Sequence, residues 1–140
     1  MSYSLRILAA SLVVLCVWAT AIFAQGSESR PLQPKHYGSV PYLSGGIGLD
    51  EQEALNQTAR DYNLKLSFAL TSGNYLADIA VEIRDAGGRV TVQAVSEGPW
   101  FFAKLLPGRY TVLVKVMEKT QQKTVQVSGK GQTVLNFFWK

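Results

Sequence analysis

From residue 63 onward the chain alternates apolar and polar residues with a period of two, which is typical of half-buried β-strands. Glycine, proline and polar residues separate the alternating segments, as in DAGGRV, a signature of a tight hairpin. The predicted strands are NLKLSFAL, LADIAVEIRD, RVTVQAV, WFFAKLL, YTVLVKVME, KTVQVSG and QTVLNFFWK. This spacing predicts an all-β fold, a seven-stranded antiparallel β-sandwich over 63–140, and argues against a parallel doubly wound sheet.

A helical segment, LDEQEALNQTARDYN, precedes the strands. Asp50 is a good N-cap residue, and Glu53 stands at the spacing of a capping box. The apolar stripe is thin, but it has the period of a helix. We therefore expect one short α-helix within 49–62, running from about Asp50 to Asp61.

The stretch SEGPWFFAKLLPGRYTV, residues 96–112, concentrates aromatic side chains around a Pro-Gly turn. Alternation along a strand places Trp100 and Phe102 on one face and Phe101 on the other. We interpret the first face as the one turned toward the core, which leaves Phe101 outside. The core residues expected here are Trp100, Phe102, Leu105 and Tyr110.

The same rule applied to the last strand turns Leu135, Phe137 and Trp139 inward and Phe138 outward. Two exposed aromatic residues on one sheet would mark a partner surface. The candidate surface residues are Phe101, Lys104 and Phe138. The alternative is that the helix or the preceding segment covers them, since a helix packed on a sheet is a common layer arrangement.

The same stretch carries a resemblance to a known family. The pattern aromatic-x-aromatic-x-x-Leu-x-Pro-Gly-x-Tyr, from Trp100 to Tyr110, resembles the carboxypeptidase regulatory-like domain, grouped with transthyretin-like and collagen-adhesin B-type sandwiches. ADIAVEIRDAGGRV is similar to the family's strand that ends in Asp and a short turn. The resemblance covers Leu64 to Trp139 and implies an accessory or interaction module. It supplies no functional residue.

The N-terminus has the layout of a secretory signal peptide, because Arg6 precedes the uncharged apolar stretch 7–24. We expect cleavage after Ala24, or alternatively after Ala21; the rival is an uncleaved anchor helix, since about 18 apolar residues just span a bilayer. Cys16 follows a leucine, which argues against lipidation. Localisation is therefore expected to be exported, periplasmic or secreted, with membrane attachment only if the segment is uncleaved.

Residues 25–48 are rich in Gly, Ser and Pro without a sustained period, which predicts a linker. The chain carries a formal net charge of +4 with its basic residues scattered singly. A nucleic-acid site usually gathers such charge into a stripe, so no nucleic-acid partner is expected.

Candidate chemistry in the exported part is sparse. It has no cysteine, and its single histidine, His36, falls in the expected linker. This excludes the usual Cys and His zinc sites and gives no base for Ser-His-Asp catalysis. The Gly-Gly-Ile-Gly run at 45–48 lacks a preceding strand and a lysine, so a phosphate loop is disfavoured. Asp78, Glu82 and Asp85 are interpreted as a solvated face rather than a calcium loop.

We therefore expect no enzyme activity and no metal or other cofactor. The leading hypothesis is a non-enzymatic exported interaction or accessory module of the cell envelope that binds a protein partner. The alternative is a carbohydrate- or polymer-binding module that stacks sugars on exposed aromatics.

The apolar N-terminal segment generates the first prediction. If it is a cleaved signal peptide, N-terminal sequencing of the mature protein should begin at Gln25, or at Ile22 for the alternative site. A cytoplasmic chain that still begins at Met1 would contradict export.

Overall fold

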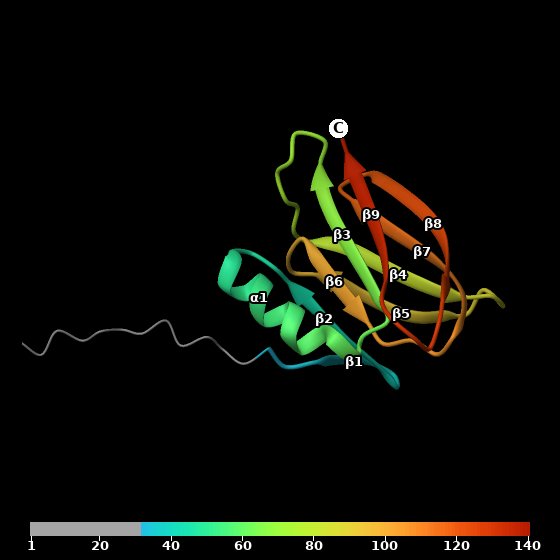
Figure 1. Ribbon diagram of the computed structural model, residues 1–140. Coiled ribbons are helices and arrows are strands. Elements are labelled where there is room, and N and C mark those ends of the chain that lie inside the picture. The colour runs from blue at the N-terminus through green and yellow to red at the C-terminus, as the bar shows by residue number, and fades with distance from the viewer. Residues whose placement is uncertain (1–31) are drawn as a thin grey trace, which may run out of the picture.

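The structure is a computed structural model that describes residues 32–140, and it is rich in β-strands with one short helix (Figure 1). The expected signal peptide and the first residues of the expected linker lie outside this range. The elements are β1 (Lys35–Tyr37), β2 (Val40–Gly45), α1 (Leu49–Thr58), the 3-10 turn η1 (Ala59–Asp61), β3 (Leu64–Leu70), β4 (Ile79–Asp85), β5 (Val90–Ser96), β6 (Trp100–Ala103), β7 (Gly108–Val116), β8 (Lys119–Val127) and β9 (Thr133–Trp139).

The strands form two sheets that face each other. One sheet has the order β1-β2-β6-β3-β9 and the other the order β5-β4-β7-β8. Each of the seven expected segments forms a strand, β3 to β9, and the sandwich-like architecture is confirmed. Two features differ from the expectation: β1 and β2 are additional strands, and β9 pairs with β3 in parallel rather than antiparallel fashion.

The prediction of a linker over 25–48 is wrong for residues 35–45. This segment is a hairpin, and β2 pairs antiparallel with β6, with Leu43 opposite Phe102. Its turn uses Gly38 with a φ of 56°, a conformation that glycine adopts without steric cost. Ser39 lies with Gly38 in the turn, whereas Pro41 and Ser44 lie within β2, where Pro41 is opposite His36 of β1 and Ser44 is opposite Phe101 of β6.

Helix α1 lies where the sequence placed it, and η1 extends it to Asp61. The predicted capping box is wrong, because Gly48 is the N-cap residue and makes no side-chain cap. Instead the Glu51 carboxylate accepts a hydrogen bond from the backbone N–H of Ile47 at 3.2 Å. At the other end, Gln132 Nε2 donates to the carbonyls of Ala59 and Tyr62, which ties the helix to the start of β9.

The main core fills the space between the two sheets. Phe101 is fully buried there and stacks on Tyr42, with ring centroids 5.3 Å apart. The buried residues of this core are Leu64, Leu66, Phe68, Ile79, Val81, Ile83, Val92, Phe101, Ala103, Leu105, Tyr110, Val112, Val114, Val125, Val127, Phe137 and Trp139. The inward assignments of Leu105, Tyr110 and the last strand are confirmed.

A second, smaller core lies between α1 and the outer face of the five-stranded sheet. Its buried residues are Leu43, Leu55, Ala59, Tyr62 and Phe102, with Trp100 packed at its margin. Trp100 and Phe102 therefore do share a face, as alternation predicts. The assignment of that face to the inside of the sandwich is wrong, because the helix makes the outer face of β6 apolar as well.

The Pro-Gly turn and its tyrosine are structural. The Tyr110 hydroxyl donates to the carbonyl of Leu106 at 2.7 Å, four residues upstream, and so closes the turn that leads into β7. This contact has the form of the tyrosine corner of β-sandwiches. Asn63 supports the same end of the molecule, because its side chain bonds both the N–H and the carbonyl of Leu105.

Burial of Phe101 generates the second prediction. Phe101→Ala should lower the free energy of unfolding by about 3–5 kcal/mol, the cost of emptying a packed aromatic site. Phe138→Thr serves as the control because 57% of Phe138 is exposed, and it should change stability by about 0.5 kcal/mol or less. Urea denaturation measures both, and a silent Phe101→Ala would contradict the placement of this ring in the main core.

Candidate interaction surface

Helix α1 covers only part of the outer face of the five-stranded sheet (Figure 1). It packs on β2 and β6, whereas the outward residues of β3 and β9 lie beyond it. Along this uncovered part Ala69 of β3 is flanked by Tyr75 on one side and Phe138 on the other, and Lys65 is opposite Val134. Paired residues project to the same face of a sheet, so these side chains share one surface.

Three apolar side chains of this surface are exposed, and we call them the apolar strip: Tyr75, Val134 and Phe138. Their exposed fractions are 59%, 49% and 57%. Single exposed apolar residues are ordinary on soluble proteins. These three, in contrast, lie on one strand, β9, and in the loop that follows β3, and they share one face of the sheet, which makes them a candidate contact surface.

The three residues predicted to form a partner surface do not lie together. Phe138 is exposed as expected and belongs to the apolar strip, but Phe101 is buried between the sheets. Lys104 is exposed and lies beyond the end of β6, next to Ala103, which pairs with Leu64 at the start of β3. Phe138 pairs near the other end of β3. The strand β3 therefore separates Lys104 from Phe138.

Sequence reasoning missed Tyr75 and Val134. Val134 shares the parity of Phe138, so alternation on β9 was the available signal. Tyr75 lies in the loop between β3 and β4, and only its bridge to Ala69 brings it to this face.

Trp100 lies at the boundary between the helix and the uncovered strands, and its ring contacts Lys65 and lies close to Gly46. The Lys65 ammonium stands 3.6 Å from the ring centroid on one side. Gly46 approaches the ring so closely that a Cβ at this position would lie 3.3 Å from ring carbons. The face of the indole under Lys65 is therefore not open to a sugar.

Lys65 is the charged group nearest to this boundary. Within residues 32–140 no carboxylate forms an ion pair with it, and it contacts the rings of Trp100 and Phe102 instead. Burial lowers the pKa of the Lys65 amine below its usual 10.5, because the partly desolvated ammonium is disfavoured.

An open depression of about 500 Å³ adjoins Trp100 on the helix side. Its polar lining comes from α1 and η1. The lining residues are Leu49, Gln52, Glu53, Asn56, Gln57, Arg60 and Trp100. Side-chain amides, a carboxylate and a guanidinium offer hydrogen bonds to a polar ligand here.

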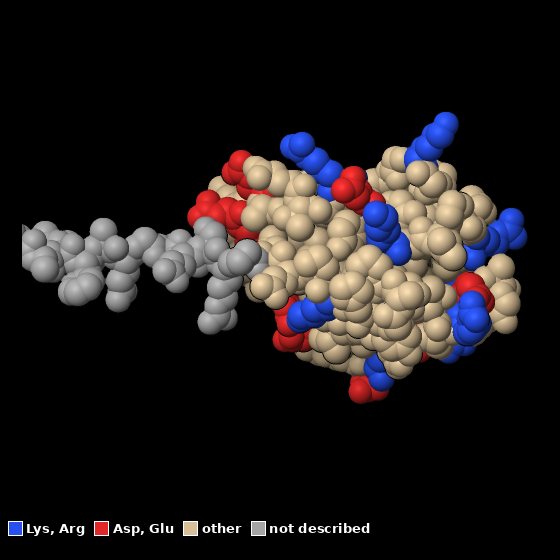
Figure 2. All heavy atoms as spheres, turned by 90° about the horizontal axis from the view of Figure 1, so that it is seen from below, with Lys and Arg blue, Asp and Glu red and all other residues tan. Residues whose placement is uncertain are grey.

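The outer face of the other sheet is not covered by the helix and carries both polar and apolar side chains. An open depression of about 580 Å³ lies over β4, β5 and β7, where Glu82 and Arg84 form an ion pair. Val95 is the exposed large apolar residue on this face, at 56%. On the side shown in Figure 2 basic residues stand singly rather than in a continuous stripe.

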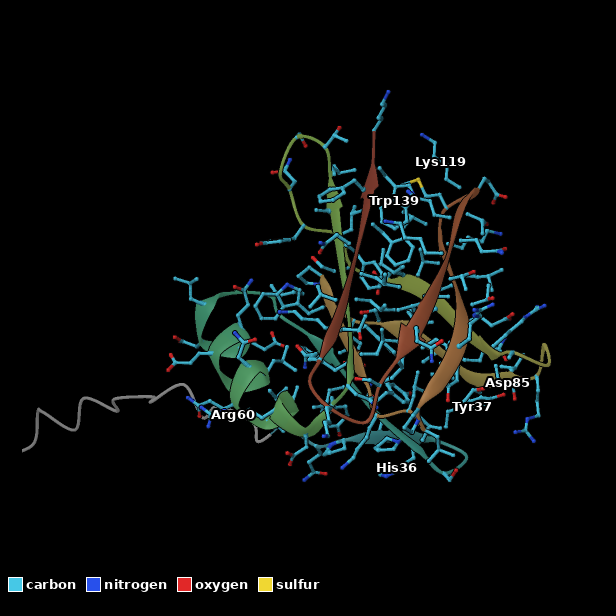
Figure 3. The ribbon with its side chains drawn as sticks, turned by 45° about the vertical axis from the view of Figure 1, so that its right-hand side comes forward. His36, Tyr37, Arg60, Asp85, Lys119 and Trp139 are labelled. Atoms are coloured by element: carbon cyan, nitrogen blue, oxygen red, sulfur yellow. The ribbon has the colours of Figure 1, made fainter. Side chains whose placement is uncertain are left out.

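The remaining candidates for chemistry are separated from one another. His36 is exposed on strand β1 rather than in a linker, and Figure 3 shows it apart from Arg60 and Asp85. Asp85 is occupied within its own hairpin, where Oδ1 accepts from the N–H groups of Gly87 and Arg89. In the part of the chain that the structure describes, no group of three or more metal-ligating His, Cys, Asp or Glu side chains converges.

Comparison with known proteins gives no family for this chain: no family model matches it, and no curated protein matches it. Between residues 32 and 140 no helix combines the length and the apolar character needed to cross a bilayer.

The lowered pKa of Lys65 generates the third prediction. Between this lowered pKa and 10.5 the unfolded chain binds more protons than the folded one, so the free energy of unfolding contributed by Lys65 rises with pH. Wild type should therefore gain stability relative to Lys65→Met across this window. Urea denaturation at several pH values below 10.5 measures the difference.

The comparison with Lys65→Met also removes a competing effect. Burial raises the pKa of Tyr62 and of Tyr110, which lowers stability at high pH, but both tyrosines are present in each protein. A difference between the two proteins that stays constant with pH would contradict the desolvation of Lys65.

Proposed function

We propose that this chain is a non-enzymatic exported interaction module of the cell envelope, and that it binds a protein partner through the apolar strip. The observation that carries the proposal is the exposure of Tyr75, Val134 and Phe138 on the part of the five-stranded sheet that α1 leaves uncovered. Burial of such side chains by a partner contributes binding free energy at roughly 25 cal/mol per Å² of apolar surface.

Rigid supports favour recognition by this strip. Val134 and Phe138 project from β9, whose neighbouring residues Phe137 and Trp139 are anchored in the main core. Contact residues held on strands lose little conformational freedom when a partner binds. The lysines around the strip, Lys65 on β3 and Lys140 after β9, give it a basic margin.

Two features of the sequence support the cellular context. The apolar segment 7–24 after Arg6 supports export. The Trp100-to-Tyr110 pattern supports membership in the carboxypeptidase regulatory-like group of sandwiches, whose members usually act as accessory domains. The tyrosine corner of Tyr110 is consistent with a β-sandwich of this kind.

A glycan is the second candidate ligand, and the depression beside α1 is the observation that favours it. Gln52, Asn56 and Gln57 line this depression with amides suited to hydroxyl groups. The Lys65 ammonium over the Trp100 ring favours the protein partner instead, because a sugar ring would have to displace it to stack on that face.

The fourth prediction tests the apolar strip. Phe138→Thr should strongly reduce recovery of a specific protein from envelope extracts in a pull-down, because it removes the aromatic surface from the strip while keeping a residue suited to strands. Val95→Thr is the matched control, since Val95 is equally exposed, at 56%, on the opposite sheet. This control should recover the partner as wild type does.

Equal recovery by wild type, Phe138→Thr and Val95→Thr would contradict binding through the strip. A glycan array with the same three proteins separates the alternative. If no protein is captured, and if Gln52→Ala and Asn56→Ala abolish binding to a saccharide, the ligand is a glycan that binds in the depression beside α1.

A further inference from the structure

Strand β9 ends the five-stranded sheet, and two backbone carbonyls on its free side accept hydrogen bonds from side chains of β8. Among residues 32–140 its only ladder partner is β3. The carbonyl of Asn136 accepts a hydrogen bond from Lys123 Nζ, and the carbonyl of Phe138 accepts one from Gln121 Nε2 at 2.7 Å. Because the N–H and C=O of one residue point to the same side of a strand, the edge groups of β9 belong to its even-numbered residues.

Lys123 and Gln121 reach this edge because they face the interior of the sandwich. Lys123 pairs with Val112 and Gln121 pairs with Val114, and both valines are buried in the main core. The Lys123 ammonium also lies 4.9 Å from the centre of the Phe137 ring. Inward-pointing charged residues at a sheet edge are a known means of preventing strand pairing with another chain.

The sequence of β9 is self-complementary around its central residue. In an antiparallel pair of two β9 strands with Asn136 opposite its own copy, Val134 of one chain would face Phe138 of the other. Aromatic and β-branched residues opposite each other stabilise antiparallel pairs. Leu135 would face Phe137 in the same register, so both faces of the paired strands would match apolar residues.

We propose that the edge of β9 is a pairing surface for a second copy of this chain, and that Gln121 and Lys123 keep it closed. The two side chains satisfy the acceptors that a second strand would use. The isolated chain is then a monomer, and withdrawal of both side chains opens the edge to a two-fold symmetric dimer. This inference does not depend on the proposed partner of the apolar strip.

The fifth prediction uses a double variant, Gln121→Met with Lys123→Met. Methionine keeps much of the length and the apolar character of both side chains but removes the donors to β9. The mass of the double variant, measured by light scattering, should be twice that of wild type at concentrations where wild type is a monomer. The matched control is Gln122→Met with Lys115→Met, because these residues lie on the outer face of the same hairpin and do not reach β9. The control should remain a monomer.

Cysteine cross-linking tests the register. Asn136→Cys in the Gln121→Met, Lys123→Met background should form a disulfide-linked dimer under mild oxidation, since paired residues at the two-fold axis lie at Cα distances that a disulfide accepts. Asn136→Cys alone should cross-link far less. Wild type, whose only cysteine is Cys16, is oxidised in parallel.

Three results would overturn the inference. The folded double variant could stay monomeric, or it could dimerise without being cross-linked through Asn136→Cys. The third result is that Asn136→Cys alone cross-links as efficiently as it does in the double-variant background. If the double variant fails to fold, Lys123→Met alone takes its place, with the same expected direction and a smaller increase in mass.

Discussion

The position of β6 between β2 and β3 is the constraint on which the rest of this fold depends. Its four residues face two different apolar layers: Phe101 and Ala103 enter the space between the sheets, and Trp100 and Phe102 face α1. Without β2 on one side and β3 on the other, neither layer would be continuous. The segment that precedes the helix is therefore part of the domain, because it supplies the strand that borders β6.

The helix determines which part of the sheet is available for contacts. Leu55 of α1 and Ala59 of η1 pack on Leu43 and Phe102, so the helical segment shields β2 and β6 but not β9. Gln132 fixes this placement from the far end of the sheet by binding the carbonyls that end the helix. Alternation along β9 turns Phe138 outward, and it stays exposed because the helix packs on other strands of the sheet.

On the side of the sandwich where β8 and β9 lie, polar side chains join the two sheets. Residues 119–140 contain four lysines and neither aspartate nor glutamate. Lys123 and Gln121 turn inward at this side and hold the edge of β9 by hydrogen bonds to its backbone. Lys123 is exposed and Gln121 is half-buried, and each donates to a carbonyl on the side of β9 away from β3. The same contacts join the two sheets and limit access to the edge.

Alternation of apolar and polar residues determined the seven strands β3 to β9, the helix and the relative orientation of neighbouring side chains, because these depend on local backbone geometry. It also identified Leu105, Tyr110, Phe137 and Trp139 as core residues. Which face of β6 meets the main core was decided only by the tertiary structure, since the helix makes both faces apolar and alternation then has no polar side to mark the outside. The strands β1 and β2 were hidden for a related reason: Pro41, Ser44 and Gly45 interrupt the pattern, and only pairing with β6 makes this segment extended. Three further contacts depend on tertiary structure. They are the parallel pairing of β3 with β9, the hydrogen bond from Lys123 to the backbone of β9, and the bridge between Tyr75 and Ala69. Such contacts follow from how the sheets assemble, and no local pattern encodes them.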